Sequence, residues 1–338
     1  MKGINIIVPM AGMGKRMRPH TLTTAKPLIP IAGKPIVERL CRDIAKVCKS
    51  KINNIAFVTG EFGEAVEKNL LNIAHSLGAQ GHICPQVEAL GTGHAVMCAK
   101  EFLEGEVIVA FADTLFKADF ELDSSSDGTI WVHKVSNPES FGVVKLDESN
   151  TITDFIEKPQ TFVSDLAIIG IYHFTHGDKL RVALQYLLDN DIKEKGEYQL
   201  TNALENLKAN GAKFKTGAVQ EWLDCGNKNA TVYTNQRVIE HNAADFKTTR
   251  NLGEGCQIIE PCYIGDDVTI VNSTVGPHVS VGNGSKITNS KITNSIIMDA
   301  CQIENATFHN SMIGNHVIWD GEAAELSISD YSTNIATV

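Results

Sequence analysis

The sequence predicts an α/β domain with a Rossmann-like, mostly parallel sheet, followed by a C-terminal β-helix. Over residues 1–240, short apolar runs alternate with segments whose apolar residues recur every three or four positions, a pattern typical of alternating strands and helices. From Gly253 to Ile318 the helical pattern disappears and β-branched residues recur at short intervals. This change predicts a first domain over residues 1–240, a repeat domain over 251–325 and a tail over 326–338.

Four runs in the first domain are predicted as strands buried on both faces, because they contain almost no polar residues. They are Ile4–Val8, Ile55–Thr59, Val107–Phe111 and Ile130–Val135. Five helices are predicted between and after them, the first starting at Pro35, since proline is favoured in the first helical turn. The others are Glu64–Leu77, His94–Leu103, Lys179–Asn190 and Gln199–Asn210. Ligands of such sheets bind at the carboxyl ends of the strands.

The repeat domain is predicted from a six-residue apolar period. The period holds within each of two groups, with a slip of one residue between them: Ile258, Ile264 and Ile270, then Val275, Val281 and Ile287. Such a repeat is typical of a β-helix, in which each coil stacks its apolar side on the coil beneath. The period becomes less regular beyond Lys286, which leaves the number of coils open.

Composition places the chain among ordinary globular proteins, with 43% hydrophobic and 21% charged residues in 338. No apolar run reaches the ~20 residues of a membrane span, and the N-terminus does not resemble a secretion signal. Eight scattered cysteines without a C-x-x-C pair favour reduced thiols. We therefore expect a cytoplasmic protein with no membrane partner.

Charge points to a small polyanionic substrate. The net charge of −10 argues against a nucleic-acid partner. Residues 1–50, however, carry ten Lys and Arg but only two Asp and Glu. A locally positive segment in an acidic protein suits a small anion, because local potential decides its binding.

The segment Val8–Pro35, here called the signature segment, carries this positive charge. Gly12 and Gly14 follow the first predicted strand, where backbone N–H groups can approach a phosphate closely. Four cations come next, at Lys15, Arg16, Arg18 and Lys26. The combination suits an oligophosphate.

Two common phosphate loops do not fit the signature segment. A P-loop requires Ser or Thr after Gly-Lys, and Gly14-Lys15 is followed by Arg16. A dinucleotide fingerprint requires a third glycine where this chain has Met17.

The pattern G-x-G-x-R-x-x-P, with Lys26-Pro27 ten residues after Arg16, resembles the signature of the sugar nucleotidyltransferases, or nucleoside-diphosphate-sugar pyrophosphorylases. The usual form is G-x-G-T-R-L-x-P followed by K-P-L-x-P, so Lys15 replaces Thr and Met17 replaces Leu. The resemblance implies that Arg16 and Lys26 are catalytic. The residues it implies as nucleotide contacts in this segment are Ala11, Gly12 and Gly14.

Residues Gln86–Ala95, the base loop, resemble the base-binding loop of that family. Gln86 offers both a donor and an acceptor, the pair needed for the edge of a pyrimidine. Gly91 lets the backbone approach the base, and Thr92 follows it in the nucleotide-binding set. The resemblance favours dTTP or UTP without deciding between them.

Two aspartates are the expected ligands of Mg²⁺. Asp113 ends a buried strand, where a carboxylate can hold the cation between nucleotide phosphates. The family usually has Gly-Asp there, whereas this chain has Ala112, which leaves the backbone less freedom. Trp222–Gly226 resembles the W-x-D-x-G element, which makes Asp224 the second ligand.

The resemblance also implies a sugar-phosphate site. Glu157-Lys158-Pro159 matches the E-K-P element, in which the lysine contacts the sugar phosphate. Gly170 lies in a strand that lines the sugar pocket. Glu197, in the segment Gly196–Leu200, accepts hydrogen bonds from sugar hydroxyls; we call this the sugar segment.

The implied enzyme joins a sugar 1-phosphate, glucose 1-phosphate favoured, to a nucleoside triphosphate and releases pyrophosphate. Histidines such as His20 and His94 are interpreted as packing or surface residues, because the attacking phosphate oxygen is already ionised. A non-catalytic regulatory subunit that binds sugar nucleotide, or a bifunctional pyrophosphorylase/acyltransferase, stays open as an alternative. The repeat resembles the left-handed hexapeptide β-helix of many members, which we expect to assemble homo-oligomers and not to take part in chemistry.

Overall fold

A computed structural model describes residues 3–12, 14–48, 50–118, 122 and 125–334. The chain divides into two compact units, the first made of Met1–Gly12 and Glu38–Trp222 and the second of Met13–Val37 and Leu223–Val338. Residues 13–37 and 223–240, which lie before the predicted domain boundary, thus group with the C-terminal part of the chain. Each unit is described by itself.

The first unit is built on a nine-stranded sheet. Its order is β10-β9-β11-β6-β1-β4-β5, with β8 paired to β11 and β12 paired to β8. The strands are β1 (Ile4–Pro9), β4 (Ile52–Thr59), β5 (Gln80–Pro85), β6 (Val107–Ala110), β8 (Gly128–Lys134), β9 (Gly142–Leu146), β10 (Ile152–Glu157), β11 (Leu166–Phe174) and β12 (Phe214–Ala218). The four predicted strands are confirmed as β1, β4, β6 and β8.

The sheet is mixed, so the expectation of a mostly parallel sheet is wrong. Strands β6, β1, β4 and β5 run parallel, as do β8 and β12. Strand β11 is antiparallel to β6, β8 and β9, and β9 is antiparallel to β10. The short connection over residues 147–151 makes β9 and β10 a hairpin, which requires antiparallel pairing. Apolar runs indicate burial but carry no information about strand direction.

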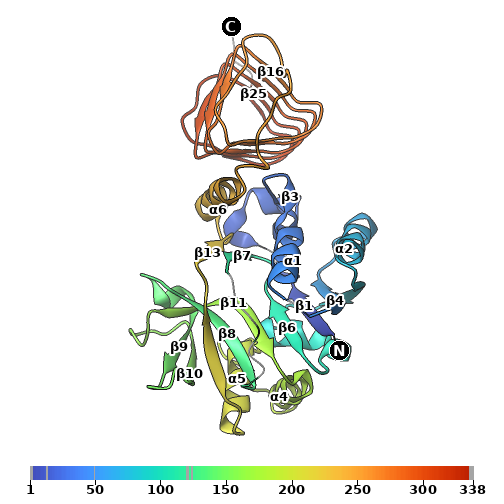
Figure 1. Ribbon diagram of the computed structural model, residues 1–338, viewed down its shortest axis with the longest axis vertical. Coiled ribbons are helices and arrows are strands. Elements are labelled where there is room, and N and C mark those ends of the chain that lie inside the picture. Colours follow the sequence, from blue (N-terminus) through green and yellow to red (C-terminus); the bar gives the residue numbers. More distant parts are fainter. Residues whose placement is uncertain (1–2, 13, 49, 119–121, 123–124, 335–338) are drawn as a thin grey trace. The chain divides into compact units, whose positions relative to one another are not determined.

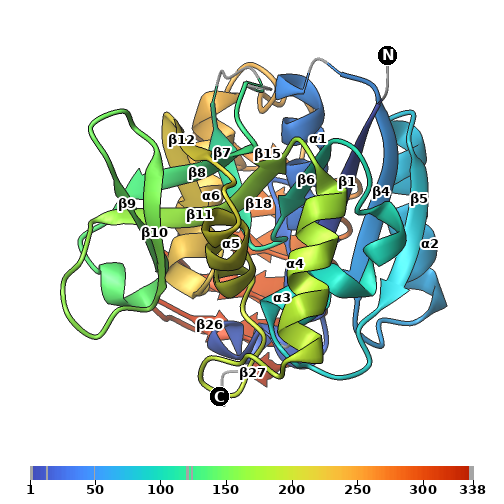
Figure 2. The same cartoon turned by 90° about the horizontal axis from the view of Figure 1, so that it is seen from below.

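Helices cover this sheet. Ile6, Ile7 and Val8 are consecutive and fully buried, which shows that both faces of β1 are covered. One face is covered by α3, α4 and α5, which pack on one another (Figure 2). The α-helices are α1 (Ile36–Val47), which starts in the second unit, α2 (Glu64–Ser76), α3 (Thr92–Cys98), α4 (Gly177–Asp189) and α5 (Leu200–Ala209). The predicted helix His94–Leu103 is shorter, since α3 ends at Cys98 and a 3-10 turn follows.

Short elements complete this part of the chain. The 3-10 turns of the first unit are η4 (Lys100–Phe102) and η5 (Pro138–Ser140). Strand β7 (Thr114–Lys117) follows the turn that carries Asp113, and β13 (Glu221–Asp224) leads the chain from the first unit into the second.

The second unit contains the cationic part of the signature segment, the helix α6 (Lys228–His241) and the repeat. Asn227 caps α6, because its side-chain oxygen accepts a hydrogen bond from the N–H of Ala230 at 3.0 Å. The elements of residues 14–35, here called the cationic segment, are η1 (Lys15–Met17), η2 (His20–Leu22), η3 (Lys26–Leu28), β2 (Pro30–Ile31) and β3 (Lys34–Pro35).

The repeat winds into a three-sided coil of parallel strands (Figure 1). Its sides are the sheets β14-β17-β20-β23, β15-β18-β21-β24-β26 and β16-β19-β22-β25-β27. This architecture is consistent with the predicted β-helix, and it extends through two strands of the predicted tail. The strands are β14 (Gln257–Ile258), β15 (Tyr263–Ile264), β16 (Thr269–Val271), β17 (Thr274–Val275), β18 (Ser280–Val281), β19 (Lys286–Thr288), β20 (Lys291–Thr293), β21 (Ile296–Ile297), β22 (Gln302–Glu304), β23 (Thr307–His309), β24 (Met312–Ile313), β25 (Ile318–Asp320), β26 (Ser327–Ile328) and β27 (Thr333–Asn334).

The coils are shorter than a strict six-residue repeat requires. Three six-residue steps would give about 18 residues per coil. Instead Thr269 pairs with Lys286, and Lys286 with Gln302, so that successive coils take 17 and then 16 residues. The 17-residue coil therefore has one step of five residues in place of six, and the 16-residue coil has two, which explains the irregular period in the sequence.

Asparagine and serine build the tight corners. Asn272 and Asn289 adopt positive φ values of 47° and 48°, which asparagine tolerates better than most residues. The buried Ser273 that follows the first of them accepts a hydrogen bond from the N–H of Ser290 at 2.9 Å, and Ser290 accepts one from Ala306 at 3.0 Å. This internal ladder satisfies backbone groups that the short corner would leave buried and unpaired.

All eight cysteines are free, and burial raises the pKa of the Cys41 thiol to about 12. Among the described residues, none of the helices has the length and apolar character needed to cross a bilayer.

Candidate functional site

The base loop of the first unit begins where β5 ends. The N–H of Gln86 donates to the carbonyl of Thr59 at 2.8 Å, which fixes its backbone beside β4. Its side-chain amide reaches back into the loop, with Nε2 3.3 Å from the carbonyl oxygen of Gly91 and 3.1 Å from Nδ1 of His94. The predicted base-reading amide is thus oriented by the loop itself.

Gly91 has a structural role that the sequence did not reveal. Its φ is 112°, and a Cβ at this position would lie 2.6 Å from the carbonyl oxygen and 2.8 Å from the nitrogen of Tyr198. The backbone of the sugar segment therefore leaves no room for a side chain at position 91.

Replacing Gly91 with alanine is expected to lower the free energy of unfolding by about 1–3 kcal/mol, because the added methyl group meets backbone atoms that cannot move aside easily. Gly78→Ala is the matched control: Gly78 also has a positive φ, 73°, but nothing lies within 4 Å of its would-be Cβ. Chemical denaturation measures both. Equal losses in the free energy of unfolding of the two variants would show that the close approach of Gly91 to Tyr198 adds no destabilisation.

Backbone hydrogen bonds join the base loop to the sugar segment. The N–H of Tyr198 donates to the carbonyl of Leu90 at 2.8 Å, and the N–H of Gly93 donates to the carbonyl of Tyr198 at 2.7 Å. The Thr92 hydroxyl donates to Oε1 of Gln199 at 3.0 Å. Two segments about a hundred residues apart therefore form one continuous wall.

Gln199 positions the predicted sugar ligand and was missed in the sequence. Its Nε2 donates to Oε2 of Glu197 at 3.0 Å, while its Oε1 accepts from Thr92. Glu197 itself is exposed. Glu197 and Gln199 are close neighbours in the sequence, but the hydrogen bond between Gln199 and Thr92 is seen only in the folded chain.

Glu157 and Lys158 lie at the end of β10. Lys158 has a positive φ of 43°, and its N–H donates to the carbonyl of Phe141 at 3.0 Å. Its Nζ lies 3.5 Å from Oε1 of Glu157, whose other oxygen accepts a hydrogen bond from the hydroxyl of Thr201 at 3.4 Å. The lysine side chain is half exposed, so its ammonium group remains accessible to an anion.

Gly170 creates a bulge in β11 that holds the turn carrying Asp113. The register of β11 with β8 shifts between Ile168 and Tyr172, and Gly170 has a φ of 86°. Its carbonyl accepts a hydrogen bond from the N–H of Phe111 at 2.9 Å, and that of Ile169 accepts one from the hydroxyl of Thr114 at 2.7 Å. Residues on both sides of Asp113 are thereby attached to β11.

Tyr172 is influenced by two of the predicted site residues, Glu157 and Asp113. Burial, and then the negative charges of Glu157 and Asp113, raise the pKa of this phenol well above its ordinary value. Asp113 and Glu157 therefore both lie near the same buried side chain. The sequence contains no signal for Tyr172 beyond its place in a strand.

Alanine at position 112, where the family usually has glycine, imposes no visible strain on the backbone. Ala112 is 2% exposed and is not among the residues with a positive φ. The conformation here therefore does not require glycine, and the predicted restriction before Asp113 has no visible consequence.

The second unit carries the cations of the signature segment. Gly14 is in the left-handed region, with φ 58° and ψ 35°, and a Cβ there would lie 2.9 Å from Cβ of Lys26. The hydroxyl of Thr21 donates to the Gly14 carbonyl at 2.9 Å, which closes the turn. Lys26 is only 8% exposed, whereas Arg16 is exposed. Gly14 thus allows the close approach of Lys26.

Asp224 ends β13 in the second unit. Its Oδ1 accepts a hydrogen bond from the N–H of Gly226 at 3.0 Å, and its backbone carbonyl accepts one from the hydroxyl of Thr234 at 2.8 Å. A Cβ on Gly226 would lie 2.8 Å from the carboxylate, so glycine at this position leaves room for the close approach of Asp224.

The donor chemistry fits Mg²⁺. Within the described ranges there is no group of three or more His, Cys, Asp and Glu side chains suited to a metal. Mg²⁺ is commonly bound by one or two carboxylates, completed by substrate phosphates and water. Asp113, in the first unit, and Asp224, in the second, offer such oxygen ligands.

Comparison with known proteins assigns the family. The family model described as nucleotidyl transferase matches residues 5–241. The chain belongs to the nucleotidyl transferase family. Its relatives include proteins named as sugar nucleotidyltransferases, so the family that the signature segment predicted is confirmed.

Two relatives illustrate the range of this nucleotidyl transferase family. The bifunctional protein GlmU of Methanococcus maripaludis is 33% identical over 230 residues, which cover 66% of this chain and 52% of that protein. The chain therefore spans about half the length of that relative. Glucose-1-phosphate thymidylyltransferase of Streptomyces antibioticus is 28% identical over 308 residues, with 84% of each chain covered.

Solved structures of the family share the fold. A putative glucose-1-phosphate thymidylyltransferase from Bacillus anthracis, solved with a sucrose, matches with a TM-score of 0.60 at 20% identity. The match covers 74% of this chain and 98% of that one. UDP-glucose pyrophosphorylase from Acinetobacter baumannii gives a TM-score of 0.57 at 22% identity, covering 72% and 95%.

Proposed function

We propose that this nucleotidyltransferase transfers a nucleotidyl group from dTTP or UTP to a sugar 1-phosphate, with glucose 1-phosphate favoured, and releases pyrophosphate. The observation that carries the proposal is the joined wall of the base loop and the sugar segment in the first unit. A wall with a base-reading amide and a sugar-facing carboxylate suits an enzyme that binds both halves of a sugar nucleotide. The names of the relatives support the same substrate classes.

The reaction needs charge neutralisation more than proton transfer. A sugar phosphate oxygen attacks the α-phosphorus in line, forming one O–P bond, while the bond from that phosphorus to the bridging oxygen breaks and pyrophosphate leaves. Because the attacking oxygen is already ionised, no general base is required. Positioning and preorganised charge then supply the rate enhancement.

Each predicted residue has a role in this proposal. Arg16 neutralises the triphosphate, and Lys26 neutralises the α-phosphate and the leaving group. Lys158 orients the attacking phosphate, and Asp113 and Asp224 hold Mg²⁺. Bound Mg²⁺ would supply further neutralisation of the phosphate charge.

The substrate assignment is tested by a matrix of the four nucleoside triphosphates against several sugar 1-phosphates, with pyrophosphate release as the readout. Turnover with a pyrimidine nucleotide and glucose 1-phosphate is the expected result. Binding of sugar nucleotide without turnover in any combination would favour the regulatory subunit instead. An acyl transfer activity in the same preparation would favour the bifunctional alternative.

The two halves of the pocket are expected to separate kinetically. Lys158→Ala should mainly raise the KM for the sugar 1-phosphate, whereas Gln86→Ala should mainly raise the KM for the nucleotide. Lys145→Ala on β9 and Gln185→Ala on α4 remove the same side-chain types from exposed positions and serve as controls. If both substitutions raised both KM values equally, the assignment of the two halves would be wrong.

A further inference from the structure

The cationic segment is attached at one end to the last coils of the repeat. Three hydrogen bonds make this first attachment, all within the second unit. They join Ser329 Oγ to the Pro19 carbonyl at 3.1 Å, His20 Nε2 to Ser327 Oγ at 3.1 Å, and Thr23 Oγ1 to Asp330 Oδ2 at 2.8 Å. The segment between Arg16 and Lys26 is therefore attached to residues about three hundred positions away along the chain.

His20 is the buried member of this attachment. Its side chain is 1% exposed, and burial lowers its pKa to about 4, so that the ring is neutral near pH 7. Its Nδ1 is buried without a hydrogen-bond partner among the described residues. The contact with Ser327 is then the polar contact that fixes the orientation of the ring.

A second attachment lies at the other end of the segment. The N–H of Ala32 donates to Oδ1 of the buried Asn235 on α6 at 2.9 Å, and the same oxygen accepts from Ser280 of the repeat at 2.7 Å. Gly33 has a φ of 79°, and a Cβ on it would lie 2.1 Å from the ring of Tyr263. Here too the segment is fitted closely against the repeat.

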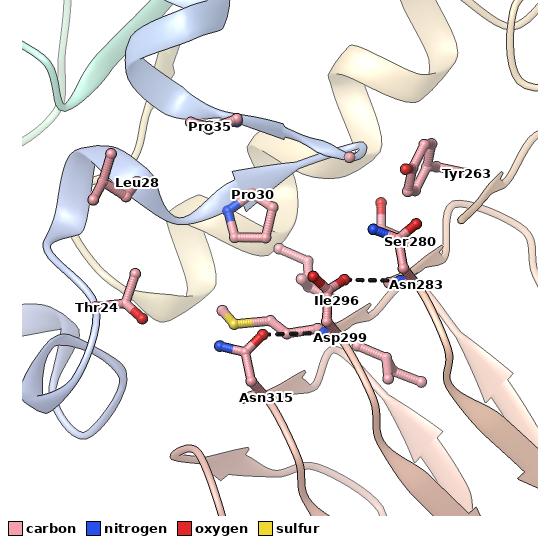
Figure 3. Close-up of a pocket in the computed structure, with 14 residues that line it drawn as sticks. Thr24, Leu28, Pro30, Pro35, Tyr263, Ser280, Asn283, Ile296, Asp299 and Asn315 are labelled. Carbon is pink, nitrogen blue, oxygen red and sulfur yellow. Dashed lines mark hydrogen bonds between the residues drawn. The ribbon is translucent and has the colours of Figure 1, made fainter. Parts of the chain in front are cut away.

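A cavity of about 240 Å³ lies between the segment and the repeat. Thr24, Leu28 and Pro30 line it from the segment, and Asp299 and Asn315 from the coils (Figure 3). The portion that carries Lys26 thus spans between two attachments and is not packed continuously on the coils beneath it. Its position depends on where its two ends are held.

We propose that the last coils of the repeat position the catalytic cations, with Ser327 and Asp330 acting on Arg16 and Lys26 through His20 and Thr23. This inference rests on the proposed function. It gives the repeat a part in catalysis, whereas the sequence led us to expect assembly alone. The coils supply the fixed geometry that electrostatic catalysis requires, because a displacement of about 1 Å can reduce turnover by up to a hundredfold.

The test removes two of the hydroxyl groups of the first attachment. The double variant Thr23→Val/Ser327→Ala leaves the predicted catalytic and metal-binding side chains intact. Both altered residues are exposed, so the protein is expected to fold. The variant should lower kcat about tenfold at saturating substrate and speed amide exchange in residues 14–28 about tenfold, because hydrogen bonds that order the segment are lost.

Two further variants serve as controls. Ser332→Ala removes a hydroxyl from the same region of the repeat, where it donates to the Ser329 carbonyl at 2.9 Å, and should change neither quantity. The conservative Thr23→Ser/Ser327→Thr variant keeps both hydroxyl groups and should retain wild-type kcat and exchange. If the double variant unfolds, Thr23→Val alone is compared in the same way.

The outcomes separate this inference from the proposed function. Wild-type kcat and exchange in the double variant would overturn the positioning role while leaving the transferase activity standing. An inactive wild-type protein would overturn the proposed function, whereas faster exchange confined to the double variant would still demonstrate the attachment. Equal effects in Ser332→Ala would show that the change reflects general loosening of the repeat, and would also overturn the proposal.

Discussion

Replacing Arg16 or Lys26 with alanine is expected to lower turnover by about a hundredfold or more, a loss typical of removing one preorganised electrostatic group. The reaction places negative charge on the triphosphate and on the departing pyrophosphate, and these two cations are the groups proposed to neutralise it. Steady-state measurement of pyrophosphate release for each purified variant gives the ratio directly.

The buried position of Lys26 requires a second substitution. Lys26 is 8% exposed, so alanine removes packing as well as charge. Lys26→Met retains most of the apolar stem and should show the same loss of turnover with a smaller loss of stability. Arg181→Ala removes a half-exposed cation from α4, where it lies 3.7 Å from Glu104, and should leave turnover unchanged. Near-normal turnover in Arg16→Ala or Lys26→Met would refute the phosphate-binding role.

Removing Mg²⁺ is expected to abolish activity, and Asp113→Asn or Asp224→Asn should each lower turnover by about a hundredfold or more, because neutralisation by a metal contributes several kcal/mol at a phosphoryl centre. Asparagine preserves the shape of each side chain. In Asp224→Asn, its carbonyl oxygen can still accept the hydrogen bond that Gly226 donates at 3.0 Å. The measurement is turnover of chelator-treated enzyme before and after Mg²⁺ is restored.

A binding measurement makes the metal prediction independent of turnover. Binding of Mn²⁺, used as a probe, should weaken in both variants when the nucleotide is present. Asp165→Asn is the control, since this half-exposed carboxylate lies 3.7 Å from Lys134 and has no proposed ligand role. Full activity of chelator-treated enzyme, or unchanged Mn²⁺ binding in both variants, would contradict the two-carboxylate site.

The sequence determined the local elements because each carries its own signal. The runs around Ile6 and Val109 contain almost no polar residues and become buried strands, as is typical of strands covered on both faces. The signature segment identified the family before any fold was known, because its glycines and cations stand in fixed order within a short stretch. Residues that are close together in the sequence are enough to indicate a motif of this kind.

The direction of β11 and the length of the coils were not determined in this way. Apolar periodicity indicates which side chains are buried, and it is the same for parallel and antiparallel pairing. The five-residue corner at Asn272 depends on its positive φ and on the hydrogen bond that Ser273 accepts from the N–H of Ser290 in the next coil, and this bond exists only once the coils stack.

The tertiary structure alone decided how distant residues support the site. Thr92 and Gln199 join the base loop to the sugar segment, and His20 and Ser327 join the cationic segment to the repeat. Each of these contacts is a single hydrogen bond between residues a hundred or more positions apart. A threonine, glutamine, histidine or serine occurs in many surroundings, so its type does not specify a partner. The partner is set by the fold, which brings the two side chains within hydrogen-bonding distance.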